Sequence, residues 1–161
     1  MDFETTTCIS IENLELLSTL ARHFDLPLHS FIVYMIIYAA KKEKAHTQVF
    51  KSITYRKRSS VRNWKRVHLY LQYKEYEYLL DVKKVWKMSV AKAIEFCVEQ
   101  VLDEFVEYLN EFIRKEKEGR SDNYLAYEIN RSYIFEYDTA EGVHCLRLYW
   151  GLPQKYARFT L

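Results

Sequence analysis

One arrangement of apolar and polar positions occurs twice in this chain, with a spacing of 62 residues. Each copy begins with a short alternating segment, continues with an amphipathic stretch of helical period, passes a tight turn and ends in a more apolar helical stretch. A strand that can pair with its own copy, followed by two helices that bury one another, predicts a unit that needs a partner, and this chain carries both halves. The apolar positions that align without a gap are Ile9 and Leu71, Leu17 and Leu79, Leu20 and Val82, Phe24 and Trp86, Leu26 and Met88, Ile32 and Ile94, and Met35 and Cys97.

The first copy predicts a strand over residues 5–11 and then two helices. β-branched residues are frequent in that segment, and its positions alternate with the period of a half-buried strand. The first helix is expected to open at Glu12 or Asn13 and to end before Pro27, which suits the first turn of the next helix. That second helix, residues 28–42, is apolar nearly all round and is expected to be the most buried element. The alternation points Thr5, Thr7, Ile9 and Ile11 inward and Thr6, Cys8 and Ser10 outward.

The second copy begins with the cleanest alternation in the chain, at residues 66–72. A helix at about 74–87 follows, and Ser89 is placed to cap the next helix, where its hydroxyl can accept from a free backbone N–H. That last helix is expected to continue to about Lys117 with acidic residues between its apolar positions. The inward strand residues are Val67, Leu69 and Leu71, and the apolar stripe of the long helix is Ile94, Val98, Val101, Phe105, Tyr108 and Phe112.

These patterns predict an α+β protein with four segments. Residues 1–42 and 66–118 hold the two copies, 43–65 form a basic connector, and 119–161 form a small C-terminal β region. The connector contains a candidate strand at 49–56 and a turn near Ser59 and Ser60. In the C-terminal region, strands are expected at 124–129, 133–138 and 143–150, with Gly142 in a hairpin turn because glycine adopts positive φ at little cost. We expect this β region to cover the apolar stripe of the long helix, since a sheet face must pack on something.

Positive charge is concentrated around the connector. The chain has a net charge of +2, yet residues 41–66 hold ten lysine or arginine residues against one glutamate, a net +9, which leaves −7 for the rest. Clustered basic residues favour an anionic partner, because they release counterions from phosphates. The alternative is a solvated basic connector without a ligand. Aromatic residues in the same segment would suit stacking on single-stranded bases, although a hairpin or strand packed on the core is the favoured interpretation.

No motif of catalysis or metal binding is present in the sequence. The five histidines have no helical ligand spacing, and three glycines could hardly build a phosphate-binding loop. The three cysteines are far apart, so reduced cytosolic thiols are expected, with Cys97 packed in the core. The acidic start lacks the features of a signal peptide, and the longest apolar run, 31–40, is half of the roughly 20 residues that a membrane helix needs. We therefore expect a cytoplasmic, non-catalytic protein without cofactor, metal or membrane contact.

Residues 67–94 resemble the ribbon-helix-helix family of DNA-binding proteins. Both copies carry residues at the positions where that family places its strand apolar residue, first-helix core, turn and second-helix core, and together the matches cover roughly half of the chain. The resemblance implies a tandem ribbon-helix-helix pseudo-dimer followed by the small C-terminal β region. The matching residues are Leu71, Leu79, Met88, Ser89 and Ile94 in the second copy and Ile9, Leu17, Ala21, Leu26 and Ile32 in the first.

For this family, a two-stranded antiparallel ribbon lies in the major groove of double-stranded DNA. Outward strand residues would contact base edges, and the start of the second helix would hold phosphate through free N–H groups and the helix dipole. Transcriptional control is the implied role. The implied base contacts are Arg66, His68, Tyr70, Gln72, Thr6 and Ser10, and the implied phosphate contacts are Ser89 and Lys92 together with the connector residues Arg56, Lys57, Arg58, Arg62 and Lys65.

The chain departs from the family pattern at three positions. Pro27 replaces the cap serine in the first copy, and Asp25 and Lys87 stand where the family's turn often has glycine. The outward strand residues of the first copy also include no Lys, Arg, Asn or Gln. Two alternatives therefore stay open for the first copy: it contacts DNA through Thr6 and Ser10, or it keeps the fold without that contact.

A fainter likeness in layout is to an uncharacterised family of small spirochaete proteins, which has no established activity. Three alternatives stay open: association of two chains into a homodimer, a protein partner at the C-terminal β region, and a protein-interaction module, antitoxin-like or for assembly, that uses the fold without DNA.

Overall fold

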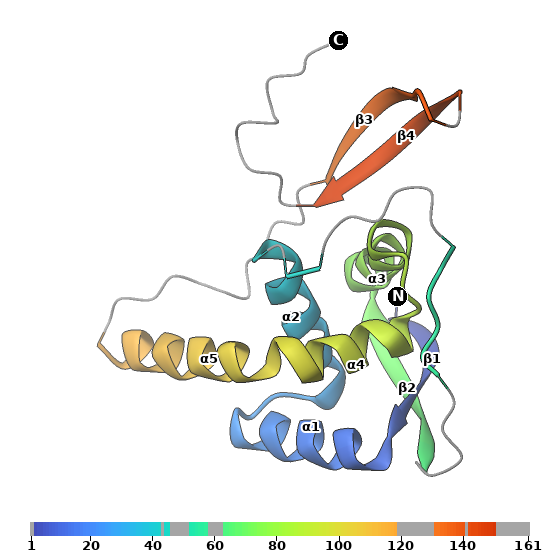
Figure 1. Ribbon diagram of the computed structural model, residues 1–161. Helices are drawn as coiled ribbons and strands as arrows, with labels where there is room; N and C mark the ends of the chain where they lie inside the picture. Colours follow the sequence, from blue (N-terminus) through green and yellow to red (C-terminus); the bar gives the residue numbers. More distant parts are fainter. Residues whose placement is uncertain are drawn as a thin grey trace.

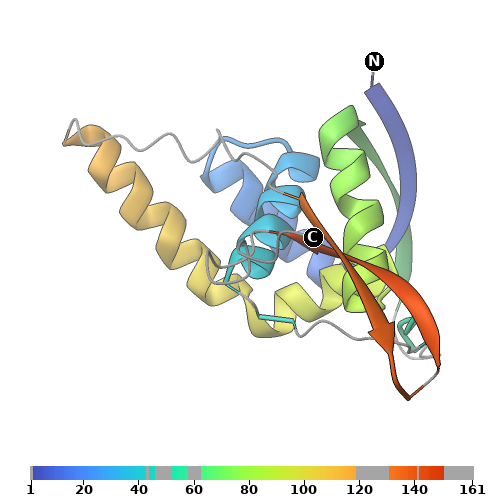
Figure 2. The same cartoon turned by 90° about the horizontal axis from the view of Figure 1, so that it is seen from above.

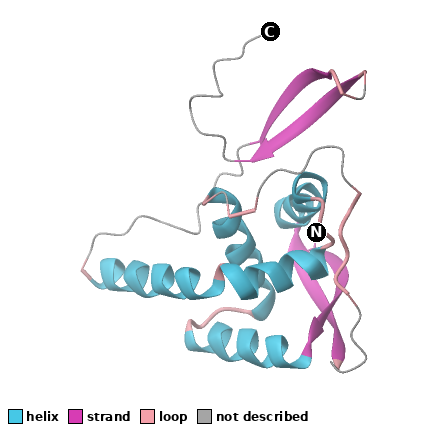
Figure 3. Cartoon of the chain, in the orientation of Figure 1, coloured by secondary structure: helices cyan, strands magenta, loops and turns pink. Residues whose placement is uncertain are grey.

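The computed structural model describes residues 2–42, 44–45, 52–57, 63–118, 131–140 and 142–150. Within these residues the chain forms five helices and two separate antiparallel pairs of strands (Figures 1 and 3). The α+β class predicted from the sequence is therefore confirmed.

The first copy forms a strand and two helices in the predicted order. Strand β1 (Asp2–Ser10) leads directly into α1 (Ile11–His23), and α2 (Leu28–Lys41) follows a short turn. Helix α1 starts earlier than expected because the Ser10 side chain accepts a hydrogen bond from the backbone N–H of Asn13 at 3.2 Å. Ile11 is therefore the first helical residue and is 38% exposed, so its predicted inward position in the strand is wrong.

The second copy repeats this order with nearly the same offset. It consists of β2 (Trp64–Gln72), α3 (Tyr73–Trp86) and α4 (Val90–Gln100), so the strand begins two residues before the predicted start at Arg66. The turns after α1 and α3 also match, because Asp25 (φ 54°) and Lys87 (φ 53°) are both left-handed and are 62 residues apart. The two copies share their turn geometry even though neither has glycine there.

The helices of both copies lie on one face of the β1–β2 sheet and share a single core (Figure 1). Helix α2 packs against β2, whereas α4 packs against β1, so each second helix crosses to the strand of the other copy. Helices α2 and α4 also contact each other. The prediction that 28–42 is the most buried segment is confirmed, because α2 contains the largest set of buried side chains: Phe31, Ile32, Val33, Met35, Ile36, Ile37, Tyr38 and Ala39.

The predicted long helix is divided into two. Val101 (φ −127°, ψ −26°) separates α4 from α5 (Leu102–Lys117), and the direction of the chain changes there (Figure 2). The Val101 N–H still donates to Cys97 O at 2.9 Å, so the turn continues while the axis bends. The bend keeps both helices against α2, where the Phe105 ring contacts Phe31 at 5.3 Å and Tyr38 at 5.5 Å between ring centroids. The single continuous helix expected from the sequence is therefore wrong, although its apolar stripe is core.

The connector is described only at residues 44–45, 52–57 and 63. Residues 52–57 do not form the predicted strand; Thr54 makes one isolated parallel bridge with Met88. The Thr54 N–H donates to Lys87 O at 2.6 Å and the Ser89 N–H donates to Thr54 O at 3.0 Å. This segment of the connector is thus held at the turn between α3 and α4. The turn predicted near residues 59–60 lies outside the described residues.

The C-terminal region contains a hairpin of β3 (Arg131–Asp138) and β4 (Val143–Trp150). Gly142 has φ 66°, as expected for the hairpin turn. The strand predicted at 124–129 lies outside the described residues. Strand β4 contacts α3, and α2 packs on the apolar stripe of α5, so among the described residues the β3–β4 hairpin is not the main cover of that stripe. The sequence could not show that α2 already occupies this face.

Within the described ranges, no helix has both the length and the apolar character needed to cross a membrane.

Candidate nucleic-acid interface

The centre of the β1–β2 ladder coincides with the centre of the sequence repeat. The strands are antiparallel, with Asp2 opposite Gln72 and Ser10 opposite Trp64. Thr6 stands opposite His68, and these two residues are equivalent positions of the two copies, 62 apart. A pseudo-twofold axis through this pair would therefore superpose each strand on the other, which is the symmetry of a closed dimer built within one chain.

The two faces of this ribbon differ in burial as the alternation predicts. The inner face carries Ile9, Leu69 and Leu71, which are at most 2% exposed. The outer face is not covered by the helices (Figure 3). The outer residues predicted from the sequence that are exposed are Thr6 of β1 and Arg66, His68, Tyr70 and Gln72 of β2.

Ser10 does not belong to this exposed set. It is 2% exposed and its hydroxyl caps α1, so the prediction that it faces outward for a base contact is wrong. The reason is its place at the end of β1, where the chain turns into the helix. Its equivalent, Gln72, also precedes a helix, and its backbone N–H donates to the Glu75 carboxylate at 2.8 Å, but the Gln72 residue remains exposed.

Glu4 is an outer-face residue that the sequence analysis missed. It lies opposite Tyr70 and is exposed, and its carboxylate pairs with His68 Nδ1 across the strands. The strand was expected to start at Thr5, so the alternation was not extended to Glu4. Glu4 precedes Thr6 and Cys8 at intervals of two residues, which places all three on the same face of a strand, and this spacing would have identified it.

The start of α4 carries the capping geometry predicted for Ser89. The Ser89 hydroxyl oxygen accepts from the Lys92 N–H at 3.2 Å, and the Ser89 N–H is used by Thr54. A serine hydroxyl can also donate one hydrogen bond, and the described residues include no acceptor for it at Ser89, so it could donate to an anion. Lys92 forms an ion pair with Glu95 at 2.7 Å, so an approaching phosphate would have to compete with that carboxylate.

The described connector residues differ in availability. The Arg56 guanidinium carbon lies 3.1 Å from the centroid of the Trp64 ring, and Arg56 Nη1 is buried without a hydrogen-bond partner among the described residues. This stacking holds the Arg56 guanidinium against the Trp64 ring, so Arg56 is less available for a contact with phosphate. Lys57 and Lys65 are exposed. Arg58 and Arg62 lie outside the described residues.

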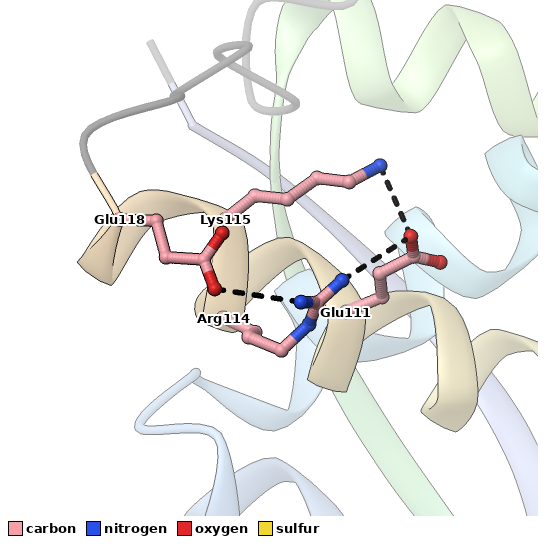
Figure 4. Close-up of polar contacts among 4 residues, drawn as sticks. All are labelled: Glu111, Arg114, Lys115 and Glu118. Carbon is pink, nitrogen blue, oxygen red and sulfur yellow. Dashed lines mark hydrogen bonds and ion pairs between the residues drawn. The ribbon is translucent and has the colours of Figure 1, made fainter.

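Helix α5 presents a surface on which charges are paired with one another. Arg114 contacts Glu118 at 3.4 Å and Glu111 at 3.9 Å, and Lys115 contacts Glu111 at 3.1 Å (Figure 4). Exposed pairs of this kind contribute little stability, about 0–1 kcal/mol each. They do leave this surface with little unbalanced positive charge to attract a nucleic acid.

The outer face of the ribbon supplies hydrogen-bond donors and acceptors in one row. Arg66 offers a planar fork of N–H donors, and Gln72 offers an amide with both donor and acceptor atoms. His68, Tyr70 and Thr6 add further polar groups. A two-stranded ribbon fits the major groove, where each base pair presents a distinct pattern of donors and acceptors.

Cys97 and Tyr78 are buried ionisable residues that have no role at this face. Burial raises the pKa of the Cys97 thiol, and burial followed by the nearby Asp81 carboxylate raises the pKa of the Tyr78 hydroxyl. Cys97 is fully buried, as predicted. Among the described residues, no group of three or more histidine, cysteine or acidic side chains is placed to hold a metal ion.

Comparison of the chain with protein-family models, with curated proteins and with solved structures found no match.

Proposed function

We propose that this protein is a non-catalytic double-stranded DNA-binding protein that inserts the β1–β2 ribbon into the major groove and regulates transcription. The fold would then be a tandem ribbon-helix-helix pseudo-dimer with an added C-terminal β region. One observation carries the proposal: an antiparallel ribbon, centred on Thr6 and His68, has one face packed against helices and an opposite face on which polar side chains are exposed. A ribbon of this kind has the dimensions that the major groove admits.

Phosphate contacts would flank the ribbon. Lys65 is exposed at one end of β2, and the connector segment that carries Lys57 is held at the start of α4 through Thr54. The exposed lysines and the N-terminus of α4 would act together on the DNA backbone, because both favour negative charge. Arg58 and Arg62 complete the proposed set from the sequence.

Fluorescence anisotropy with labelled duplexes tests this proposal. The intact protein is titrated with random-sequence DNA and with DNA flanking its own gene, at several salt concentrations. The logarithm of the binding constant should fall linearly with the logarithm of the salt concentration, with a slope of roughly −0.9 per phosphate contacted. Arg66→Ala should weaken binding by about fivefold to a hundredfold, since a bidentate contact to guanine is worth about 1–3 kcal/mol and each 1.4 kcal/mol is tenfold.

Arg114→Ala is the matched control for this experiment. It removes the same side chain and charge from α5, where Arg114 is paired with Glu111 and Glu118 (Figure 4). Its affinity should stay close to that of the parent, and circular dichroism should show that both variants fold. Equal losses in the two variants would assign the effect to net charge and contradict the ribbon as the contact surface.

A protein-interaction module is the second candidate. It is favoured by the Glu4 carboxylate on the outer face and by the engagement of Lys92 and Arg56 within the chain. In that case the outer face of the ribbon or the β3–β4 hairpin would meet a protein partner. Absence of DNA binding at low salt would favour this candidate over the first.

A further inference from the structure

The pseudo-twofold relation of the ribbon pairs outer positions that carry different chemistry. With an offset of 62, Glu4 is equivalent to Arg66, Thr6 to His68 and Cys8 to Tyr70. The first of these pairs is opposite in charge, and both of its residues are exposed. A true dimer would present the same side chain at both positions, whereas this chain presents a carboxylate at one and a guanidinium at the other.

The ladder places these two groups toward opposite ends of the ribbon. Glu4 stands opposite Tyr70, and Arg66 stands opposite Cys8, with the Thr6–His68 pair between them. Each lies two residues from that central pair, so they are separated along the ribbon by about 14 Å, from a rise of roughly 3.4 Å per residue. With a spacing of about 3.4 Å per base step, this corresponds to roughly four base-pair steps.

From this arrangement we infer that the duplex recognised by this protein is not palindromic: Arg66 contacts a guanine of one strand, and Glu4, at the symmetry-equivalent position about four base-pair steps away, contacts a cytosine of the other strand. One strand therefore carries guanine at both positions, where a palindrome would carry guanine at one and cytosine at the other. The inference rests on the proposed DNA-binding function. Arginine donates two hydrogen bonds to guanine O6 and N7, whereas a carboxylate accepts from the cytosine N4 amino group. Operator symmetry mirrors protein symmetry, so a ribbon whose equivalent positions differ in this way selects unlike half-sites.

The pairing of Glu4 with His68 is compatible with this role. The ion pair uses Glu4 Oε1, while a carboxylate has about four lone-pair positions on its two oxygens. Glu4 can therefore accept from His68 and from a cytosine amino group together. The pair also restrains the Glu4 side chain before DNA binds, which reduces the conformational entropy that binding would cost.

Selection of preferred duplexes from a random-sequence pool, followed by sequencing, tests the inference with the intact protein. The parent protein should enrich one non-palindromic sequence with guanine at both positions of one strand, at the stated separation, and cytosine at both positions of the other strand. Glu4→Arg makes the two equivalent positions alike. It should shift the enriched sequence toward an inverted repeat, in which the guanines of the two half-sites lie on opposite strands. Glu107→Arg provides the matched control, because it introduces the same charge change at an exposed position of α5 and should leave the enriched sequence unchanged.

The outcomes separate this inference from the function on which it rests. Enrichment of a palindrome by the parent protein, or an unchanged preference in Glu4→Arg, would overturn the asymmetric recognition while leaving DNA binding in place. A parent protein that retains no duplex at low salt would overturn the proposed function and the inference together. A circular dichroism spectrum of Glu4→Arg that matches the parent's establishes that the comparison concerns a folded protein.

Discussion

Replacing the left-handed residues Asp25 and Lys87 by glycine should stabilise the protein. Their φ values are 54° and 53°, in the turns after α1 and α3. This conformation costs a residue with a Cβ about 1–2 kcal/mol. Glycine avoids that cost but loses about 0.5–1 kcal/mol more conformational entropy on folding. The difference predicts a gain of roughly 0.5–1 kcal/mol for Lys87→Gly and a smaller gain for Asp25→Gly, because aspartate tolerates the left-handed region better than lysine.

Urea unfolding followed by circular dichroism would measure these changes. In thermal unfolding, a gain of 1 kcal/mol corresponds to a rise in Tm of about 2–4 °C for a chain of this size. Glu107→Gly is the control, because glycine at an exposed position inside α5 should cost about 1 kcal/mol. If Lys87→Gly destabilised the protein as much as Glu107→Gly does, the left-handed conformation assigned to Lys87 in the turn between α3 and α4 would be contradicted.

Two further predictions concern helix capping and pH. Ser89→Ala removes the cap of α4 and should lower the free energy of unfolding by about 1 kcal/mol, measured by urea titration, while Ser89→Asp should restore most of it. Because the pKa values of Cys97 and Tyr78 are raised in the folded state, their contribution to stability is fully present below the ordinary values of 9.0 and 10.0 and is lost as pH rises above them. Thermal unfolding should therefore show that Tm falls above about pH 9, and that it falls less in Cys97→Ala and Tyr78→Phe. An equal fall in the parent and these variants would assign the pH dependence to other groups.

Local pattern was sufficient to predict most of the elements of both copies. The alternation at 66–72 identified the inward and outward residues of β2, because side chains alternate strictly between the faces of a strand. The cap at Ser89 followed from its hydroxyl and its place before an apolar helical stretch. The burial of α2 followed from its lack of a polar face.

The remaining features depend on contacts between segments that are distant in sequence. Ser10 continues the strand alternation, yet its hydroxyl caps α1, and only the point where the chain leaves the ladder decides between these roles. The bend at Val101 involves no proline or glycine and accompanies packing of both α4 and α5 on α2. The stacking of Arg56 on Trp64 requires the connector to return to the start of β2, which composition does not reveal.

The candidate site was predictable where it consists of one strand and less so where it combines elements. Four outer residues of β2 were identified from alternation alone. Glu4 was missed because the start of β1 was placed three residues too late, and its pairing with His68 depends on the register of the ladder. Under the proposed function, this carboxylate makes the two symmetry-equivalent ends of the ribbon chemically different.

Photo-cross-linking to a duplex that contains halogenated pyrimidines, followed by peptide mapping, tests most directly the central claim that the outer face of the ribbon contacts DNA. We predict cross-links in the peptide that contains residues 64–72, at Tyr70 or His68 in particular, and their loss in the presence of excess unlabelled duplex. Cross-links confined to α5 or to the β3–β4 hairpin, with none in β1 or β2, would contradict the claim.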